Sequence, residues 1–166
     1  MKNLHSLVDY LKENNLVLAT AESCTGGEIM ATLSKQGECG ECLFIGYVTY
    51  HHQAKTKELG VKESTISKYS LTSEEVAIEM VKGVFKHKNV NLGIATTGII
   101  GPESMDDIPP GTICFAWAFK LNNKIHVVSE TKHFVNESPK DLPKKASLYA
   151  LSKLKKYHEQ MLKELK

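Results

Sequence analysis

The chain contains no arginine: its 21 basic residues are all lysines, set against 19 acidic residues, for a net charge of +2. A phosphate or carboxylate ligand must therefore be held by lysine point charges, backbone N–H groups or hydroxyls, because the bidentate guanidinium fork is missing. Nucleic-acid sites usually cluster basic and aromatic residues, whereas these lysines are spread out except near the C-terminus. The composition argues against a nucleic-acid partner.

Cysteines and long apolar runs are also scarce. Four cysteines are few for a disulfide scaffold, and no stretch approaches the roughly 18 to 20 apolar residues of a membrane helix. The N-terminus is too polar for a secretion signal, so we expect a cytoplasmic protein that has no membrane partner.

Cys39 and Cys42 have zinc-pair spacing, but no second Cys/His pair accompanies them, so an ordinary loop is favoured and no metal site is predicted.

Length and hydrophobic periodicity predict a single α/β domain over residues 1–166. Helices are expected at 4–13, 25–35, 53–60, 71–88 and from about Pro139 onward. Strands are expected at 15–20, 42–50, 91–99, 111–121 and 124–134, the last two joined as a hairpin by Asn122 and Asn123. Because strands and helices mostly alternate, a sheet covered by helices on both faces is expected.

Reactive residues are concentrated directly after the first expected strand. Ser23 and Cys24 lie where this strand meets a helix, and the N–H groups of the next three residues could bind a phosphate or an oxyanion. The segment matches neither the Walker A, the GxGxxG nor the GxSxG pattern. A merely capped strand-to-helix turn is the alternative. A second glycine and hydroxyl cluster, at 96–102, would lie at the same edge of the sheet, where ligands of open α/β sheets bind.

A serine nucleophile needs a base, and the segment VTYHHQAK offers candidates. Lysine acts as a base when burial lowers its pKa, and Ser–Lys pairs are an established alternative to Ser–His pairs. Tyr50 and Lys55 are five residues apart across a strand end and a helix start, so both could face one pocket. His51 and His52 are interpreted as solvated loop residues rather than metal ligands.

Five separated segments in unbroken order carry a family resemblance that extends over roughly residues 5 to 155. They are TAESCTGG, GYVTYHHQAK, SEEVAIEMVKGV, TGIIGP and GTICFAWA. The chain resembles the C-terminal domain of the competence/damage-inducible protein CinA, whose stand-alone members are nicotinamide mononucleotide amidohydrolases.

The resemblance implies a three-layer α/β/α sandwich with a mixed, mostly parallel sheet, assembled as a homodimer. It also implies hydrolysis of the carboxamide of a small nucleotide substrate, nicotinamide mononucleotide, to a carboxylate and ammonia, without a cofactor. The catalytic residues implied are Ser23, Tyr50 and Lys55. The substrate-binding residues implied are Thr25, Gly26, Gly27, Thr97, Gly98 and Gly101. A non-catalytic nucleotide-binding or partner module with the same fold is the alternative function.

Three segments depart from the family pattern. His51 and His52 replace a serine and an asparagine, and the segment 103–110 brings in acidic residues at Asp106 and Asp107. Lysines at 140, 144 and 145 stand where the family tends to place arginines. These changes leave the proposed catalytic residues in place and alter the surroundings on which substrate choice depends.

Overall fold

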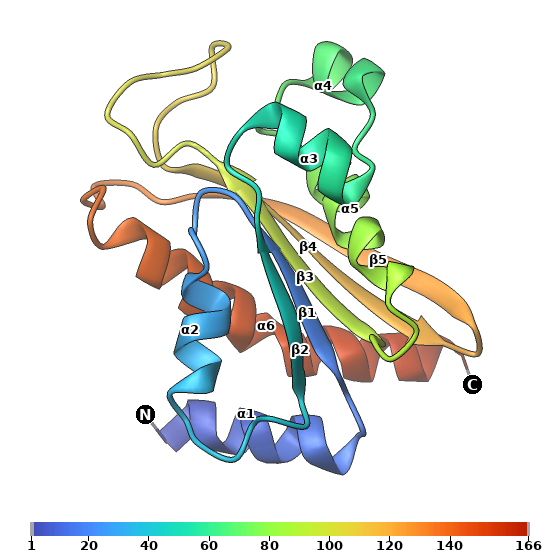
Figure 1. Cartoon of the computed structure of the whole chain (residues 1–166). Helices are drawn as coiled ribbons and strands as arrows, with labels where there is room; N and C mark the ends of the chain where they lie inside the picture. The colour runs from blue at the N-terminus through green and yellow to red at the C-terminus, as the bar shows by residue number, and fades with distance from the viewer. Residues whose placement is uncertain (1, 166) are drawn as a thin grey trace.

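The computed structural model describes residues 2–165 and contains one five-stranded sheet between two layers of helices (Figure 1). The strands are β1 (Leu18–Glu22), β2 (Leu43–Val48), β3 (Leu92–Gly98), β4 (Thr112–Leu121) and β5 (Lys124–His133). The helices are α1 (Lys2–Glu13), α2 (Glu28–Ser34), α3 (His52–Leu59), α4 (Glu63–Tyr69), α5 (Glu74–Gly83), the 3-10 turn η1 (Val84–Lys86) and α6 (Leu142–Glu164).

The sheet is mixed, with the strand order β2-β1-β3-β4-β5. β1 pairs in parallel with both β2 and β3, whereas β4 is antiparallel to its neighbours β3 and β5. Four of the five strands therefore share one direction, and only β4 runs the other way. The predicted three-layer α/β/α fold with a mixed, mostly parallel sheet is confirmed.

Alternation of large and small side chains along β4 divides the core between the two faces of the sheet. The large residues, which pack with α1, α2 and α6, are Ile113, Phe115, Trp117 and Phe119. The small residues, which pack with α5, are Cys114, Ala116 and Ala118. Small residues allow a helix to approach a sheet closely, so α5 lies tightly against the strands while aromatic rings fill the other layer.

α3 is held close to α5 by a glycine at the end of α5. A Cβ atom on Gly83 would lie 2.1 Å from the carbonyl oxygen of Leu59, the last residue of α3. α3 ends at Gly60, whose φ of 71° is a left-handed conformation that favours glycine. These two glycines set the position of α3, the helix that carries Lys55.

Most predicted elements are confirmed, with some changes at their ends. The first strand was expected at 15–20 but occupies Leu18–Glu22, because pairing with β2 and β3 on both sides extends it past Thr20. The last helix begins at Leu142 instead of Pro139. The predicted hairpin turn is present, with Asn122 and Asn123 both at positive φ.

The topology places the carboxyl ends of β2, β1 and β3 side by side at one edge of the sheet (Figure 1). Both reactive clusters predicted from the sequence follow these strand ends. Within residues 2–165, no helix is both long enough and apolar enough to cross a membrane.

Candidate active site

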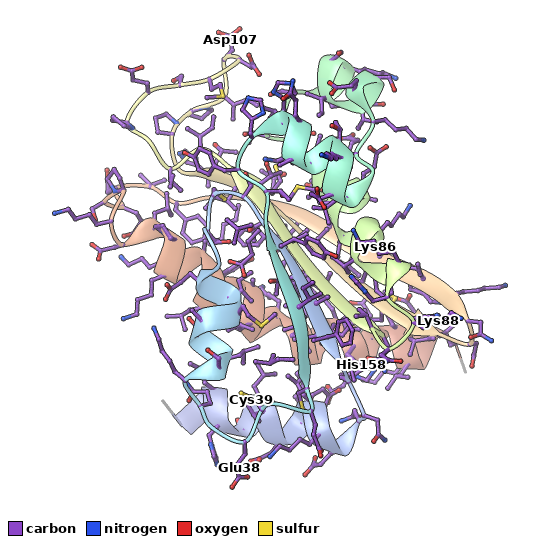
Figure 2. The ribbon with its side chains drawn as sticks, viewed as in Figure 1. Glu38, Cys39, Lys86, Lys88, Asp107 and His158 are labelled. Atoms are coloured by element: carbon purple, nitrogen blue, oxygen red, sulfur yellow. The ribbon has the colours of Figure 1, made fainter. Side chains whose placement is uncertain are left out.

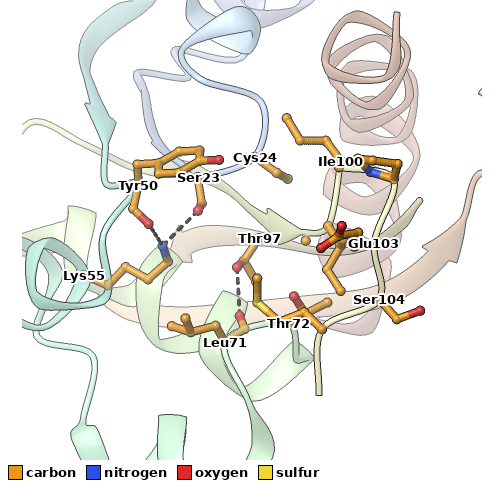
Figure 3. A pocket seen from close by; sticks show the side chains of 15 residues that line it. Ser23, Cys24, Tyr50, Lys55, Leu71, Thr72, Thr97, Ile100, Glu103 and Ser104 are labelled. Carbon is orange, nitrogen blue, oxygen red and sulfur yellow. Dashed lines mark hydrogen bonds between the residues drawn. The ribbon is translucent and has the colours of Figure 1, made fainter. Parts of the chain in front are cut away.

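Ser23 and Lys55 are in direct contact at the carboxyl edge of the sheet (Figure 3). Lys55 Nζ lies 2.8 Å from Ser23 Oγ, 2.6 Å from the carbonyl oxygen of Thr49 and 3.0 Å from that of Tyr50. The serine and the lysine that the resemblance implies as catalytic residues are therefore hydrogen-bonded to each other. Ser23 directly follows β1, and Lys55 reaches it from the second turn of α3.

The main chain around Ser23 is fixed from both sides. The N–H of Ser23 donates to the carbonyl of Thr96 at 3.0 Å, and the N–H of Thr49 donates to the carbonyl of Glu22 at 2.9 Å. These two bonds continue the parallel pairing of β1 with β3 and β2 just past the strand ends. The serine therefore has little backbone freedom, which favours a constant distance to its partner.

The amine of Lys55 is deeply buried, with only 1% of the residue exposed. Burial disfavours its charged form and lowers the pKa of Lys55 from the ordinary 10.5 to about 8. Its two carbonyl partners can only accept hydrogen bonds, so they hold two N–H groups of Nζ. When the amine is neutral, its lone pair is consequently left facing the Ser23 hydroxyl, which is the orientation that a general base needs.

Tyr50 contributes to this arrangement through its main chain. Its carbonyl accepts from Lys55, whereas 73% of the residue is exposed and its hydroxyl has no hydrogen-bond partner among residues 2–165. The ring belongs to the pocket lining, close to Ser23 (Figure 3). The resemblance implies a catalytic role for Tyr50, but its hydroxyl makes no hydrogen bond to Lys55 or Ser23. The residue orients the lysine with its backbone oxygen.

Cys24 is the other potential nucleophile in the pocket. It is 3% exposed, and burial raises the pKa of its thiol to about 12. The thiol is therefore protonated near neutral pH, and only the thiolate is strongly nucleophilic. The arrangement thus favours the hydroxyl of Ser23, which has a base beside it.

The turn after Ser23 is organised by Glu22, a residue that no sequence pattern marks as functional. Its carboxylate is completely buried at the start of α2. It accepts four hydrogen bonds, from the Thr25 hydroxyl and from the N–H groups of Gly27, Ile29 and Met30. The start of α2 therefore already binds an anion, supplied by the protein itself.

This arrangement corrects the expected role of the glycine pair. The N–H of Gly27 donates to Glu22 and that of Gly26 donates to the carbonyl of Ser23, so neither is free for a ligand. The helix α2 is capped at Gly27, and the Thr25 hydroxyl bonds Glu22 and Thr96. The N–H groups of Cys24 and Thr25 make no hydrogen bond to another residue in the described chain.

The second predicted cluster forms the opposite wall of a cavity of about 430 Å³ that contains Ser23 and Lys55. Thr97, Gly98 and Gly101, which the resemblance implies as substrate-binding residues, all line it. The hydroxyl of Thr97 donates to the carbonyl of Leu71 at 2.8 Å. Position 98 requires a glycine because β3 pairs closely with β4 there. A Cβ atom on this residue would lie 2.5 Å from the carbonyl oxygen of Thr112.

Several lining residues were not predicted, and they come mainly from two irregular segments. They are Leu71, Thr72, Ile99, Ile100, Pro102, Glu103, Ser104 and Met105. Ile99, Ile100 and Pro102 belong to the predicted 96–102 cluster, whereas nothing in the sequence marks the other five as functional, because irregular loops show no periodicity. A volume of this size falls within the range of roughly 300 to 1,000 Å³ that is typical of small-molecule sites.

Four residues of the segments that depart from the family pattern lie outside this cavity, whereas Glu103, Ser104 and Met105 of the segment 103–110 line it. His51 Nδ1 accepts from the N–H of Gln53 at the start of α3, and its ring lies 4.4 Å from that of His52. Asp106 accepts from the hydroxyl of Ser70, and Asp107 lies at the tip of the loop (Figure 2). Among residues 2–165, none of these four side chains lines the pocket.

The fold and the site together define an α/β domain with a serine–lysine pocket at the carboxyl edge of its parallel strands. The CinA C-terminal domain family matches residues 2–158, and the chain belongs to this family.

Named relatives agree with this assignment. Protein YdeJ of Escherichia coli is 38% identical over 139 residues, which cover 82% of this chain and 78% of that protein. A Clostridium tetani protein named as competence-damage inducible is 47% identical over 94 residues, which cover 57% of this chain but only 23% of the relative. The chain therefore matches about a quarter of that longer protein.

A solved structure has the same fold. The CinA superfamily protein from Escherichia coli superposes with a TM-score of 0.82 at 34% identity, covering 90% of this chain and 86% of that chain.

Proposed function

We propose that the chain is an amidohydrolase that converts nicotinamide mononucleotide to the corresponding carboxylate and ammonia. One observation carries the proposal: a buried lysine with a pKa of about 8 lies 2.8 Å from the hydroxyl of Ser23 in an open pocket. The choice of substrate rests on the resemblance to stand-alone members of the family. The name of the Clostridium tetani relative refers to competence and damage induction, that of YdeJ states no role, and neither name states a reaction.

The reaction begins with proton transfer from Ser23 Oγ to neutral Lys55 Nζ as the oxygen attacks the carboxamide carbon. The tetrahedral oxyanion needs N–H donors, and the amides of Gly26 and Gly27 are already bonded within the protein. We therefore assign this role to the N–H groups of Cys24 and Thr25, the former belonging to the residue after the nucleophile, a common source of such a donor. One donor of this kind typically lowers the barrier by about 2.7 to 4 kcal/mol.

The same lysine completes the reaction. Lys55 returns the proton to the leaving nitrogen, ammonia departs, and an ester between Ser23 and the substrate acyl group remains. Lys55, neutral again, takes a proton from water as the water oxygen attacks this ester. The carboxylate product leaves, and Ser23 recovers its proton.

The test measures ammonia release from nicotinamide mononucleotide by wild-type protein and by Ser23→Ala and Lys55→Ala. Each substitution is expected to lower kcat by roughly 100-fold to 10,000-fold, the range for loss of a positioned proton-transfer group. Lys57→Ala is the matched control, because Lys57 is an exposed lysine on the same helix. Turnover that survives in both site variants would rule out this mechanism.

The alternative, a non-catalytic nucleotide-binding module, predicts binding of the mononucleotide without ammonia release in any variant. Isothermal titration calorimetry of the same proteins separates the two. The homodimer that the resemblance implies is part of the proposal and is tested by light scattering after size-exclusion chromatography. A cytoplasmic location also remains a prediction.

A further inference from the structure

Only two charged side chains line the described pocket, and neither can hold a phosphate. They are Lys55 and Glu103. All the hydrogen-bonding positions of Lys55 Nζ are engaged by Ser23 and the carbonyls of Thr49 and Tyr50. In the form in which Lys55 acts as a base it is also uncharged. The reactive pocket therefore carries a net negative charge, from the Glu103 carboxylate on the wall across from Ser23 and Lys55 (Figure 3).

The nearest alternative place for a phosphate is no more favourable. A second cavity shares Ile100, Gly101 and Pro102 with the pocket and is lined by another carboxylate, Glu137. Lys145, a candidate replacement for a family arginine, is ion-paired with Glu137. Neither cavity has Lys140 or Lys144 in its lining among the described residues. A phosphate in either cavity would therefore face a carboxylate without a free lysine, and only hydroxyls and backbone N–H groups could hold it.

From this charge distribution we infer that the pocket prefers a cationic aromatic amide without a phosphate group, with Glu103 as the residue that sets the preference. This inference rests on the proposed amidohydrolase chemistry and revises its preferred substrate from the mononucleotide to the form without phosphate. A pyridinium carboxamide bound through its ring nitrogen to ribose fits this description. Its phosphorylated form carries roughly −1.5 to −2 additional charge near neutral pH, which Glu103 repels.

Two further features of the pocket favour a flat cation. The exposed ring of Tyr50 lies in the lining and offers a π-face to a positively charged ring. The rest of the wall is largely apolar or main chain, including Leu71, Ile99 and Ile100. Such a wall accepts an aromatic ring and supplies no additional positive charge.

The experiment compares kcat/KM for nicotinamide riboside and nicotinamide mononucleotide at pH 8, followed by ammonia release. We expect wild-type protein to favour the riboside. Glu103→Gln should lower kcat/KM for the riboside by roughly 2-fold to 5-fold, the range for a partly exposed charge pair, and raise it for the mononucleotide. Glu103→Lys should reverse the preference. Added salt should weaken the preference of the wild-type protein, because it screens both interactions.

The matched control is Asp107→Asn. It removes one negative charge from the same loop, but Asp107 does not line the pocket. Its ratio of kcat/KM values for the two substrates should equal that of wild type. A change as large as that in Glu103→Gln would show that net charge, rather than the position of Glu103, sets the ratio, and would overturn the inference.

The two proposals fail differently. If the protein hydrolyses both substrates but favours the mononucleotide, and Glu103→Gln leaves the ratio unchanged, the inference is overturned and the amidohydrolase function stands. If neither substrate releases ammonia, the proposed function fails. Calorimetry on Ser23→Ala then still decides the ligand preference: tighter binding of the riboside supports the role of Glu103, and equal or weaker binding overturns it.

Discussion

At the scale of single residues, the most informative feature is the set of partners around Lys55. A lysine buried to 1% exposure normally requires a carboxylate, yet the described chain gives it two carbonyls and a hydroxyl. A carboxylate would stabilise the ammonium and raise its pKa, whereas carbonyls leave the neutral amine accessible near pH 8. These partners thus stabilise the charged form of Lys55 less than a carboxylate would, and the lysine can act as a base near pH 8.

The first prediction concerns the pH dependence of turnover. Because Lys55 must be neutral to accept the Ser23 proton, kcat/KM should rise with pH and level off above a midpoint near 8. Below that midpoint it should fall about tenfold per pH unit, as expected for one essential proton. Initial rates between pH 6 and 10 measure the profile. A flat profile across pH 7 to 9 would contradict the assignment of Lys55 as the base.

The second prediction concerns the stability cost of the same lysine. Its pKa is about 8 in the folded state and 10.5 ordinarily, so between these values the unfolded chain binds more protons and stability rises with pH. The free energy of unfolding of wild type, relative to Lys55→Met, should therefore increase from pH 7 to pH 9. The increase is at most about 1.4 kcal/mol per pH unit.

Urea unfolding of both proteins at pH 7, 8 and 9 provides the measurement. Titration of other groups is common to wild type and variant and cancels in the difference. A difference that is constant with pH would show that the lysine has an ordinary pKa.

At the scale of secondary-structure elements, the segment from β1 to α2 owes its shape to Glu22. Four donors converge on one buried carboxylate, and Ser23 is the next residue in the chain. The position of Ser23 and the stability of the turn that holds it therefore both depend on the Glu22 carboxylate.

Glu22→Gln should destabilise the fold by about 2 to 4 kcal/mol, because an amide supplies one acceptor oxygen and turns an NH₂ group toward existing donors. Activity should fall as well, since the turn that holds Ser23 shifts. Glu28→Gln, in the first turn of α2, is the control and should cost no more than about 1 kcal/mol. Chemical denaturation and ammonia release are the measurements, and equal stabilities of the two variants would refute the role given to Glu22.

A second element-scale prediction concerns the contact between α5 and α3. Gly→Ala within a helix usually stabilises a protein by about 0.5 to 1 kcal/mol. At Gly83 the new Cβ would lie 2.1 Å from the carbonyl oxygen of Leu59, so Gly83→Ala should instead destabilise by about 1 to 3 kcal/mol. α3 would move and carry Lys55 with it, lowering kcat by roughly 10-fold to 100-fold.

Gly40→Ala is the matched control, because its Cβ would meet open space and its φ is not positive. It should leave thermal stability and turnover near wild type. If Gly83→Ala behaved in the same way, the close packing of α5 on α3 would not be what positions the lysine.

At the scale of the whole molecule, the sequence predicted what depends on periodicity and turn chemistry. The hairpin turn at Asn122 and Asn123 follows from such a local rule, and it is present. The Ser23–Lys55 contact was also predictable, because both residues follow parallel strands that end at one edge.

Other features depend on tertiary structure and leave no local signal. Glu22 looks like a polar residue at a strand end until the N–H groups of α2 converge on it. The contribution of Tyr50 is a carbonyl group, which every residue has. Glu103 lines the pocket only because the irregular loop that carries it passes beside the pocket.

The last prediction concerns the contact between the first and last helices of the described structure. Tyr10 in α1 hydrogen-bonds Nδ1 of His158 in α6 at 2.8 Å, in a buried position against Phe119. Burial lowers the pKa of His158 below its ordinary 6.5, while the nearby Glu159 has a weaker opposite effect. The folded state therefore holds this histidine neutral in a range where the unfolded chain is already protonated.

Stability should consequently decline as the pH falls below about 6.5, by no more than about 1.4 kcal/mol per pH unit from this group. His158→Asn keeps an acceptor for Tyr10 but cannot titrate, so its own stability should decline less over the same range. Thermal unfolding of both proteins between pH 5 and 7.5 measures the difference. Parallel curves would mean that protonation of His158 does not oppose docking of α1 on α6, whereas convergence of the two curves toward pH 5 would show that it does.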